Sequence, residues 1–324
     1  MQQAPPSDSH SPSHGSGTAI EPAVAGHAGA MSVVVIGQIG RDMVLRTDGL
    51  PKPNGSTPVL ERRELLGGKG ANQAVALTQL GVPTALIGVV GQDIEGAAVL
   101  RQADRDRIDV GCVVRRGRTA LLVDLVDADG TRRLFEDVPD ESLVTLDDLD
   151  RCGTLFQPAG VVSIQLQQPP QTTLAAARHA RRMGARVVAD GLPDAAVRDD
   201  LLASVDVLRA DAEEAALLAG GELRSVDDAV AVARRLSLAG PRWVALAVPG
   251  VGDVLVWEQD ATVFPHADVH VVDRTGAGDA FVAGLVAGVH RGVGPRAAGE
   301  LAAAAAASQV QHLGGRPHLA ELSG

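Results

Sequence analysis

The chain has 324 residues, 45% of them hydrophobic but only 2% aromatic, and a formal net charge of −11 at pH 7. This length suits one α/β domain, alone or with a small attachment. The acidic balance argues against nucleic acid or an anionic membrane as a partner, and no apolar run is long enough to span a bilayer. A small anionic ligand is not excluded, because local N–H groups and a few basic residues decide its binding.

The composition of the first thirty residues indicates where the folded domain begins, and the cysteines indicate the cellular compartment. Residues 1–30 are rich in Ser, Pro, Gly, His and Ala and lack the basic start and apolar core of a signal peptide. We therefore expect a disordered tail, followed by one folded domain over residues 31–320. The only cysteines, Cys112 and Cys152, have neither metal-ligand spacing nor a disulfide framework around them. Such cysteines are typical of reduced thiols in a cytosolic protein, so we expect a cytoplasmic location.

The first half of the chain mixes buried-strand runs, helical segments and hairpin signals. Strands are expected at Ser32–Gly37 and Thr84–Gly91, and helices at Lys69–Leu80 and from Ile94 to about Arg107. Between these elements, two insertions favour exposed strands and turns, and the second contains the two-residue hairpin signal Asp129-Gly130. We expect the insertions, about residues 42–66 and 119–135, to form a small second sheet.

The second half of the chain alternates regularly between strand and helix patterns. The expected strands are Val161–Ile164, Arg186–Ala189, Val205–Leu208 and Trp243–Val248, with a hairpin at Asp253–Phe264. The expected helices are Thr172–Met183, Ala212–Ala219, Val226–Leu238, Asp279–Val289 and Arg296–Gln311. This alternation predicts a doubly wound α/β fold, in which helices flank both faces of a mostly parallel sheet and ligands bind at the carboxyl ends of its strands.

The segment VVDRTGAGDAFVAG places a carboxylate, Asp279, in the first turn of an Ala- and Val-rich helix. In the simpler interpretation, the acidic residue opposes the helix macrodipole and the glycines make a tight turn. However, Thr275, Gly276, Ala277 and Gly278 leave several N–H groups without side-chain cover, as in a phosphate cradle. A carboxylate beside phosphate is suited to removing a proton from a hydroxyl that attacks the phosphate.

Two further segments offer polar groups to a ligand. In LLGGKGANQA, Gly68 permits close backbone approach, and Lys69 and Asn72 offer donors to sugar hydroxyls at a helix start. This is no Walker A loop, because Gly70 follows the lysine in place of Ser or Thr. In GQIGRDM, Asp42 stands just beyond the first strand and can accept hydrogen bonds from a vicinal diol, although a surface Asp is the simpler interpretation. The third glycine of the dinucleotide fingerprint is missing there, which argues against a dehydrogenase.

These pieces occur in a recognisable order. Asp42 follows the first strand, and then come GGKGAN, a hairpin, the acidic stretch Asp211–Glu214 and DRTGAGD. That order resembles the ribokinase-like carbohydrate kinases, also called the PfkB family, over about Ser32 to His318. The resemblance implies a doubly wound α/β domain with a small β-sheet lid, transfer of the γ-phosphate of ATP to a sugar or nucleoside hydroxyl, and a homodimer formed through the lid.

Carried over by position, the resemblance gives each motif residue a role. Asp279 would be the catalytic base, and Gly276, Ala277 and Gly278 would form the anion hole. The residues holding the sugar would be Asp42, Gly68, Lys69, Asn72 and Gln167. The residues at the nucleotide would be Asp211, Gly250, Gly252 and Thr275. Mg²⁺ would arrive with ATP, bound through phosphates and water with Glu214 acting indirectly. A monovalent cation such as K⁺ would lie near Asp273, Thr275 and the backbone of Gly314.

Departures from the family pattern bear on the substrate. Gly40 stands where ribokinases carry Asn, and Gln167 stands where they carry a sugar-binding Glu, so ribose loses polar contacts and Gly40 leaves room for a bulkier group. The family motif NxxE reads DAEE, and TLGxxG reads AVPGVG. We expect a ribokinase-type pentose as substrate, with another sugar or a nucleoside as the alternative. The altered nucleotide motifs favour a competing class, a non-catalytic sugar or nucleotide sensor, whereas intact Asp279 and Lys69 count against it.

Overall fold

The computed structural model describes Met1 and residues 32–128, 130–157, 159–314 and 316–322. The disordered tail expected over residues 1–30 lies outside the described residues, apart from Met1, and so does Asp129 of the predicted hairpin turn. None of the helices in the described part of the chain combines the length and apolar character needed to cross a bilayer.

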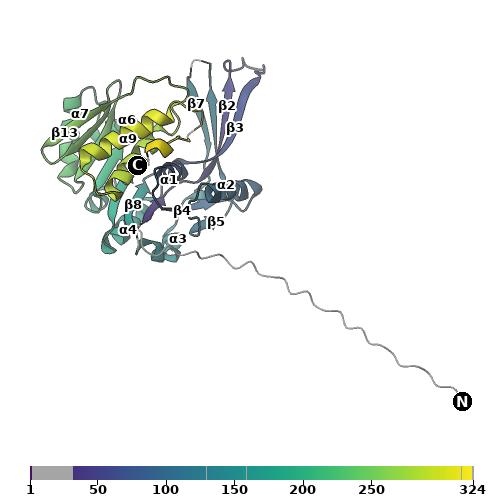
Figure 1. Ribbon diagram of the computed structural model, residues 1–324, viewed down its shortest axis with the longest axis horizontal. Helices are drawn as coiled ribbons and strands as arrows, with labels where there is room; N and C mark the ends of the chain where they lie inside the picture. Colours follow the sequence, from purple (N-terminus) through teal and green to yellow (C-terminus); the bar gives the residue numbers. More distant parts are fainter. Residues whose placement is uncertain (2–31, 129, 158, 315, 323–324) are drawn as a thin grey trace. The chain divides into compact units, whose positions relative to one another are not determined.

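A nine-stranded sheet forms the centre of the fold (Figure 1). Its strands, from edge to edge, are β13 (Asp260–Pro265), β12 (Gly252–Trp257), β11 (Trp243–Val248), β10 (Val207–Ala210), β9 (Arg186–Asp190), β8 (Ala159–Gln165), β1 (Ser32–Ile36), β4 (Thr84–Val90) and β5 (Val113–Arg115). The strands from β11 to β5 run parallel, and β12 and β13 add an antiparallel hairpin at one edge.

Both faces of this sheet are buried under helices, as its continuous Val-rich strands require. Val33 and Val35 of β1 point into one core, and Val34 and Ile36 point into the other. The helices in the first core are α1 (Lys69–Gln79), α2 (Ile94–Arg105), α8 (Ala277–His290) and α9 (Pro295–Gln309). Those in the second are α3 (Leu146–Arg151), α4 (Pro170–Arg182), α5 (Arg198–Leu202), α6 (Ala212–Ala219) and α7 (Val226–Ser237).

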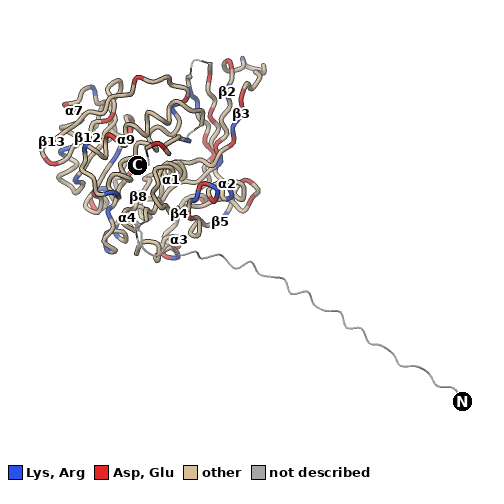
Figure 2. Tube along the Cα trace, in the orientation of Figure 1, with Lys and Arg blue, Asp and Glu red and all other residues tan. Residues whose placement is uncertain are grey.

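The two insertions form a separate four-stranded sheet (Figure 1). Its strands, in order, are β3 (Val59–Gly67), β2 (Gly40–Thr47), β6 (Ala120–Val126) and β7 (Arg132–Asp137). The edge strand β3 carries charged side chains of both signs (Figure 2). We call these four strands the small sheet.

The doubly wound fold predicted from the sequence is confirmed, and the expected elements occur with shifts of a few residues at their ends. One placement differs. Asp42 was expected just beyond the first strand of the main sheet, but it lies inside β2 of the small sheet, because the chain leaves β1 at Gly37 and enters the small sheet at Gly40. The carboxylate is therefore held by paired strands and not by a loop.

Candidate active site

Polar side chains gather at the carboxyl ends of the central strands of the main sheet. Gln38 follows β1, Asp190 ends β9 and Arg209 lies in β10, next to the point where the chain reverses its strand order around β1. Such a switch point is where open α/β sheets bind ligands. A cavity of about 260 Å³ lies here, between the main sheet and the small sheet. Its lining includes Gln38, Asp42, Gly68, Lys69, Asn72, Leu122, Asp124, Arg132, Glu136, Gln167, Asp190, Arg209, Asp211, Thr275, Gly276, Gly278 and Asp279. We call it the first cavity.

Asp279 lies buried at the start of α8, with its carboxylate in the first cavity. The helix begins after Gly276, whose φ of 74° is a left-handed conformation that glycine adopts without strain. Asn72 Nδ2 donates a hydrogen bond to Asp279 Oδ2 at 2.9 Å. Burial, and then the nearby carboxylate of Asp190, raise the pKa of Asp279 to about 6. A carboxylate with this pKa is ionised at neutral pH and basic enough to accept a proton from a hydroxyl.

Asp42 is a second buried carboxylate in the first cavity. It accepts a hydrogen bond from the backbone N–H of Gly68, while Oδ1 has no hydrogen-bond partner among the described residues. Burial, followed by the negative charges of Asp124 and Asp279, raises the pKa of Asp42 to about 7. A Cβ at Gly67 would lie 1.8 Å from the Asp42 carboxyl carbon, so only glycine fits there. Asp42 thus brings to the wall of the first cavity a buried acceptor oxygen without a partner among the described residues.

Lys69 and the acidic start of α6 line the opposite side of the first cavity. Lys69 Nζ lies 3.7 Å from Glu214 Oε1. Although burial lowers the pKa of Lys69, the carboxylates of Asp190 and Glu214 outweigh it and raise that pKa above its ordinary value. Asp211 caps α6, because its Oδ1 accepts the Glu214 N–H at 2.9 Å and Glu214 Oε2 accepts the Asp211 N–H at 2.8 Å. The altered motif DAEE thus forms a closed capping box.

Two charged residues that sequence reasoning missed, Asp190 and Arg209, form a buried pair beneath these groups. Arg209 Nη1 lies 3.3 Å from Asp190 Oδ1, and Gln73 Nε2 donates to Asp190 Oδ2 at 3.0 Å. Because Gly278 has no side chain, the guanidinium lies against it: a Cβ there would be 3.0 Å from Nη2. The available signal was a charged residue at the end of each of two predicted strands, RVVAD and VLRAD.

A second cavity, of about 400 Å³, adjoins the first and shares Arg209 and Gly278 with it. Its walls are mostly small or apolar and come from β11, β13, the loop after β13, α8 and α9: Ala247, Phe264, Pro265, Val269, Val271, Ala277, Phe281, Ala303, Ala306, Ala307 and Val310. Asp253 also lines it; burial raises the pKa of this carboxyl, and its Oδ1 has no partner among the described residues.

Of the four residues expected to bind the nucleotide, two line the first cavity and two line neither cavity. Asp211 and Thr275 line the first cavity. Among the described residues, the lining of neither cavity includes Gly250 or Gly252. Gly250 is exposed in the turn between β11 and β12, and Gly252 pairs with Pro265 in the hairpin. Their contact with a nucleotide stays a prediction.

The residues expected around a monovalent cation are brought together beside Gly276. Asp273 Oδ1 accepts the N–H and the hydroxyl of Thr275 at 2.9 and 2.8 Å, and Oδ2 accepts the N–H of Gly314 at 2.9 Å. Gln309 Nε2 donates to the Thr275 carbonyl at 2.8 Å. Asp273 therefore ties the loop before α8 to the loop after α9, which fixes the backbone of the N–H cradle.

Two residues expected near the sugar, Gln167 and Gly40, depart from the ribokinase pattern, and the structure gives a different answer for each. Gln167 lines the first cavity, as expected. The expectation that Gly40 leaves room for a bulkier substrate is wrong: a Cβ there would lie 2.8 Å from Leu122 Cδ1 and 3.1 Å from the Ala120 carbonyl oxygen. Leu122 itself lines the cavity, so the space beside Gly40 is already filled by the neighbouring strand.

Known proteins resemble this chain over most of its length. A sequence profile for the pfkB family carbohydrate kinases matches residues 30–321. The ATP-dependent ribose-1-phosphate kinase of Halopiger xanaduensis is 33% identical over 259 residues, which are 79% of this chain and 83% of that protein. The ribokinase of Arabidopsis thaliana is 27% identical over 317 residues, 92% and 81% of the two chains. The solved ribokinase structure from Thermotoga maritima matches with a TM-score of 0.75 at 25% identity, covering 88% of this chain and 95% of that one.

Proposed function

Because the chain belongs to the pfkB family of carbohydrate kinases and is an ATP-dependent sugar kinase, we propose that it phosphorylates a neutral ribose-type sugar. The sugar binds in the first cavity, ATP lies in the second, and Asp279 takes the proton from the attacking hydroxyl. The observation that carries this proposal is the position of Asp279, which is buried beside the N–H cradle where the two cavities meet.

The charge of the first cavity favours a neutral sugar. Its lining holds six carboxylates, against three cations: Lys69, Arg132 and Arg209. All three cations already face carboxylates: Arg209 faces Asp190, Arg132 faces the buried Asp124 of β6, and Lys69 faces Glu214. Carboxylates accept hydrogen bonds from sugar hydroxyls and repel a second phosphate.

A second candidate substrate is ribose 1-phosphate. The relative from Halopiger xanaduensis carries that substrate in its name, and the Arg132 side chain, 34% exposed, is the cation of the small sheet that lines the first cavity. Binding of a phosphate there requires Arg132 to leave Asp124 or to bridge the two anions.

We also propose the ions that the family resemblance implies. Among the described residues no group of three or more His, Cys, Asp or Glu is placed to hold a metal, and this fits a Mg²⁺ ion bound mainly by ATP phosphates and water. The carboxylates of Asp211 and Glu214 would help to hold such an ion through water. Around Gly276, the fixed loops at Asp273 and Gly314 fit a role for K⁺ in shaping the cradle. A cytoplasmic location and a homodimer through the small sheet complete the proposal.

The test is ADP release measured across ribose, 2-deoxyribose, ribose 1-phosphate, hexoses and nucleosides, each with ATP and Mg²⁺. We expect the highest kcat/KM for ribose or 2-deoxyribose. A best substrate that carries phosphate would replace the first candidate with the second, and a nucleoside or hexose as best substrate would reject both. Hydrogen exchange adds a structural check, because bound sugar should protect residues 42–66 and 119–135 together if the small sheet closes over it.

A further inference from the structure

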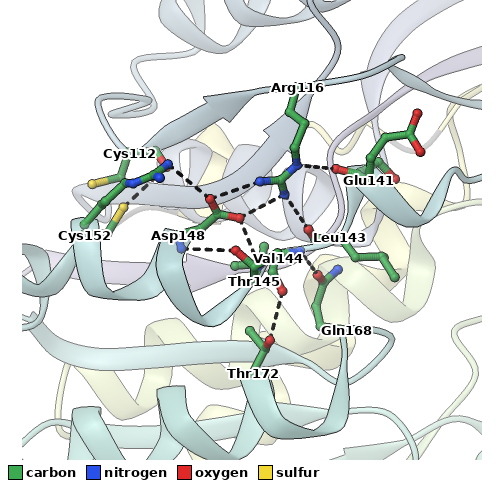
Figure 3. A network of polar contacts seen from close by, with 12 residues as sticks. Cys112, Arg116, Glu141, Leu143, Val144, Thr145, Asp148, Cys152, Gln168 and Thr172 are labelled. Atoms are coloured by element: carbon green, nitrogen blue, oxygen red, sulfur yellow. Dashed lines mark hydrogen bonds and ion pairs between the residues drawn. The ribbon is translucent and has the colours of Figure 1, made fainter.

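The only two cysteines of the chain lie side by side, 40 positions apart in sequence (Figure 3). Cys112 directly precedes β5, and Cys152 caps the C-terminus of α3. Cys152 Sγ donates a hydrogen bond to the Cys112 carbonyl oxygen at 3.6 Å, so the two residues are in contact. Cys152 is 2% exposed, whereas Cys112 is partly exposed. Cys112 is thus the thiol that a reagent in solution can reach.

The segment between the two cysteines contains half of the small sheet. Strands β6 and β7 both lie between Cys112 and Cys152 in sequence, and their hairpin carries the cavity residues Asp124 and Arg132. A bond between the cysteines would join the two ends of this segment and close it into a loop.

The base of the same segment is already held by an ion-pair network (Figure 3). Arg116, four residues after Cys112, donates to both carboxylate oxygens of Asp148 at 3.2 and 2.9 Å and to the Leu143 carbonyl at 2.9 Å. Asp148 is 1% exposed and sits in α3, one turn before Cys152. Because this network fixes β5 against α3, it keeps the two thiols adjacent.

A short line of polar contacts links this base to the first cavity. Gln168 Oε1 accepts the Val144 N–H at 2.8 Å, and Gln168 Nε2 lies 3.5 Å from Gln165 Oε1. Gln165 Oε1 also accepts the N–H of Gln38, a residue of the cavity lining, at 3.3 Å. These contacts connect the segment before α3 with the lining of the first cavity.

We propose that Cys112 and Cys152 form a redox modification site, in which a peroxide converts the two thiols into a disulfide that fixes the base of the β6–β7 hairpin. The Cys112 thiolate attacks one peroxide oxygen, the O–O bond breaks and hydroxide leaves, so that Cys112 becomes a sulfenic acid. The Cys152 sulfur then attacks the Cys112 sulfur, the S–O bond breaks, the S–S bond forms and water leaves. In balance, two thiols are oxidised and one peroxide is reduced to two waters.

The local environment assigns different roles to the two thiols. The hydrogen bond from Cys152 lowers the pKa of Cys112, which favours the thiolate at the accessible position. The same hydrogen bond, together with burial, raises the pKa of Cys152, so the buried thiol stays protonated until the sulfenic acid forms beside it. These directions match an attacking Cys112 and a resolving Cys152.

The test treats the full-length reduced protein with hydrogen peroxide, followed by mass spectrometry, thiol titration and peptide mapping. We expect both thiols to disappear, the mass of the protein to fall by two hydrogens, and a linked Cys112–Cys152 peptide to be found in monomeric protein. Dithiothreitol should restore both thiols. Hydrogen exchange in β6 and β7 should be slower in the oxidised protein. Two titratable thiols after peroxide, oxygen adducts without a linked peptide, or cross-linked dimers alone would overturn the proposal.

Two single variants keep the test decisive. In Cys152→Ala, Cys112 should stop at the sulfenic acid and react with dimedone, whereas Cys112→Ser should consume peroxide much more slowly. Equal peroxide consumption by Cys112→Ser and the parent protein would contradict the assigned roles. These readouts do not depend on which sugar the kinase uses. The redox proposal can therefore be rejected while the proposed function holds, and the proposed function can be rejected while the redox proposal holds.

Discussion

The two cavities that meet at Gly278 are built in opposite ways. The first is lined mainly by charged and amide side chains from strands, strand ends and loops, several of them buried and mutually paired. The second is lined mainly by Ala, Val, Phe and Pro, although Arg209, Asp253 and Arg274 also line it. Chemistry that moves a proton needs particular side chains at fixed positions, whereas binding of a flat, largely apolar ring depends mainly on shape and apolar surface.

This difference predicts how each cavity responds to substitution. Changes in the first cavity should alter the rate of the chemical step or the ionisation of neighbouring groups. Changes in the second should alter the KM for ATP and leave the chemistry intact. Arg209 belongs to both cavities and should couple them.

The largest expected effect comes from Asp279→Asn. The amide can still accept the hydrogen bond from Asn72 but cannot take up a proton, so kcat should fall by about two to four powers of ten. The KM for the sugar should change little, because the side-chain volume is kept. Steady-state kinetics measures both, and a variant with parental kcat would reduce Asp279 to a residue that stabilises the helix start.

Arg209→Gln should have the next largest effect. The guanidinium lies against Gly278 of the N–H cradle, where it can stabilise charge on the transferring phosphoryl group, and removing one such donor costs about 10²–10³-fold in kcat. Since Asp190 would be left without its cation, the double variant Arg209→Gln with Asp190→Asn separates misfolding from chemistry: we expect it to fold and to stay slow.

The matched control for this prediction is Arg181→Gln. Arg181 pairs with Asp206 at 3.1 Å, before β10 and away from both cavities, so its loss should leave kcat unchanged. Equal losses in the Arg181 and Arg209 variants would show a general stability effect and no role for Arg209 in catalysis.

Asp42→Asn tests how much the buried negative charge of Asp42 lowers the free energy of unfolding. In the folded protein the pKa of Asp42 is raised from 3.8 to about 7, so between these values the native state binds more protons than the unfolded state. Stability therefore falls as pH rises through this window. At about pH 8 the variant should be more stable than the parent, on the order of a few kcal/mol, and the gain should vanish below about pH 4. Urea unfolding at both pH values measures it, and a destabilised variant at the higher pH would contradict the burial penalty.

The smallest effect is expected in the second cavity. Ala306→Leu adds volume to an apolar wall of the second cavity and reduces the space for a nucleotide, so the KM for ATP should rise by roughly tenfold, which corresponds to about 1.4 kcal/mol of binding free energy. The KM for the sugar and the melting temperature should stay close to the parental values. An unchanged KM for ATP would mean that the nucleotide does not occupy this cavity.

The fold class and the motif residues that line the first cavity could be predicted from the sequence alone. Buried Val-rich runs alternating with Ala-rich periodic segments allow few arrangements other than a doubly wound sheet, and GGKGAN and DRTGAGD each place their polar groups within one turn or helix start. Asp279, Asn72 and Lys69 could therefore be named, and the structure places them together.

What sequence could not supply depends on contacts between distant segments. Asp190 and Arg209 pair across two parallel strands, and neither belongs to a local motif. The second cavity is formed by Ala residues of α9, by Phe264 and Pro265 of β13 and by Val269 and Val271 of the loop that follows, so no local pattern marks it. Gly40 suggested empty space, but the side chain that fills it comes from β6, about eighty positions later.

The pH dependence of kcat/KM for the sugar tests the central claim most directly, because this ratio reports the ionisation of the free enzyme and the claim assigns proton removal to one buried carboxylate. With the pKa of Asp279 raised to about 6, kcat/KM should be constant above that pH and fall about tenfold for each pH unit below it. A kcat/KM that stays constant down to about pH 4, the ordinary range of an unperturbed carboxyl, would contradict the assignment of Asp279 as the base.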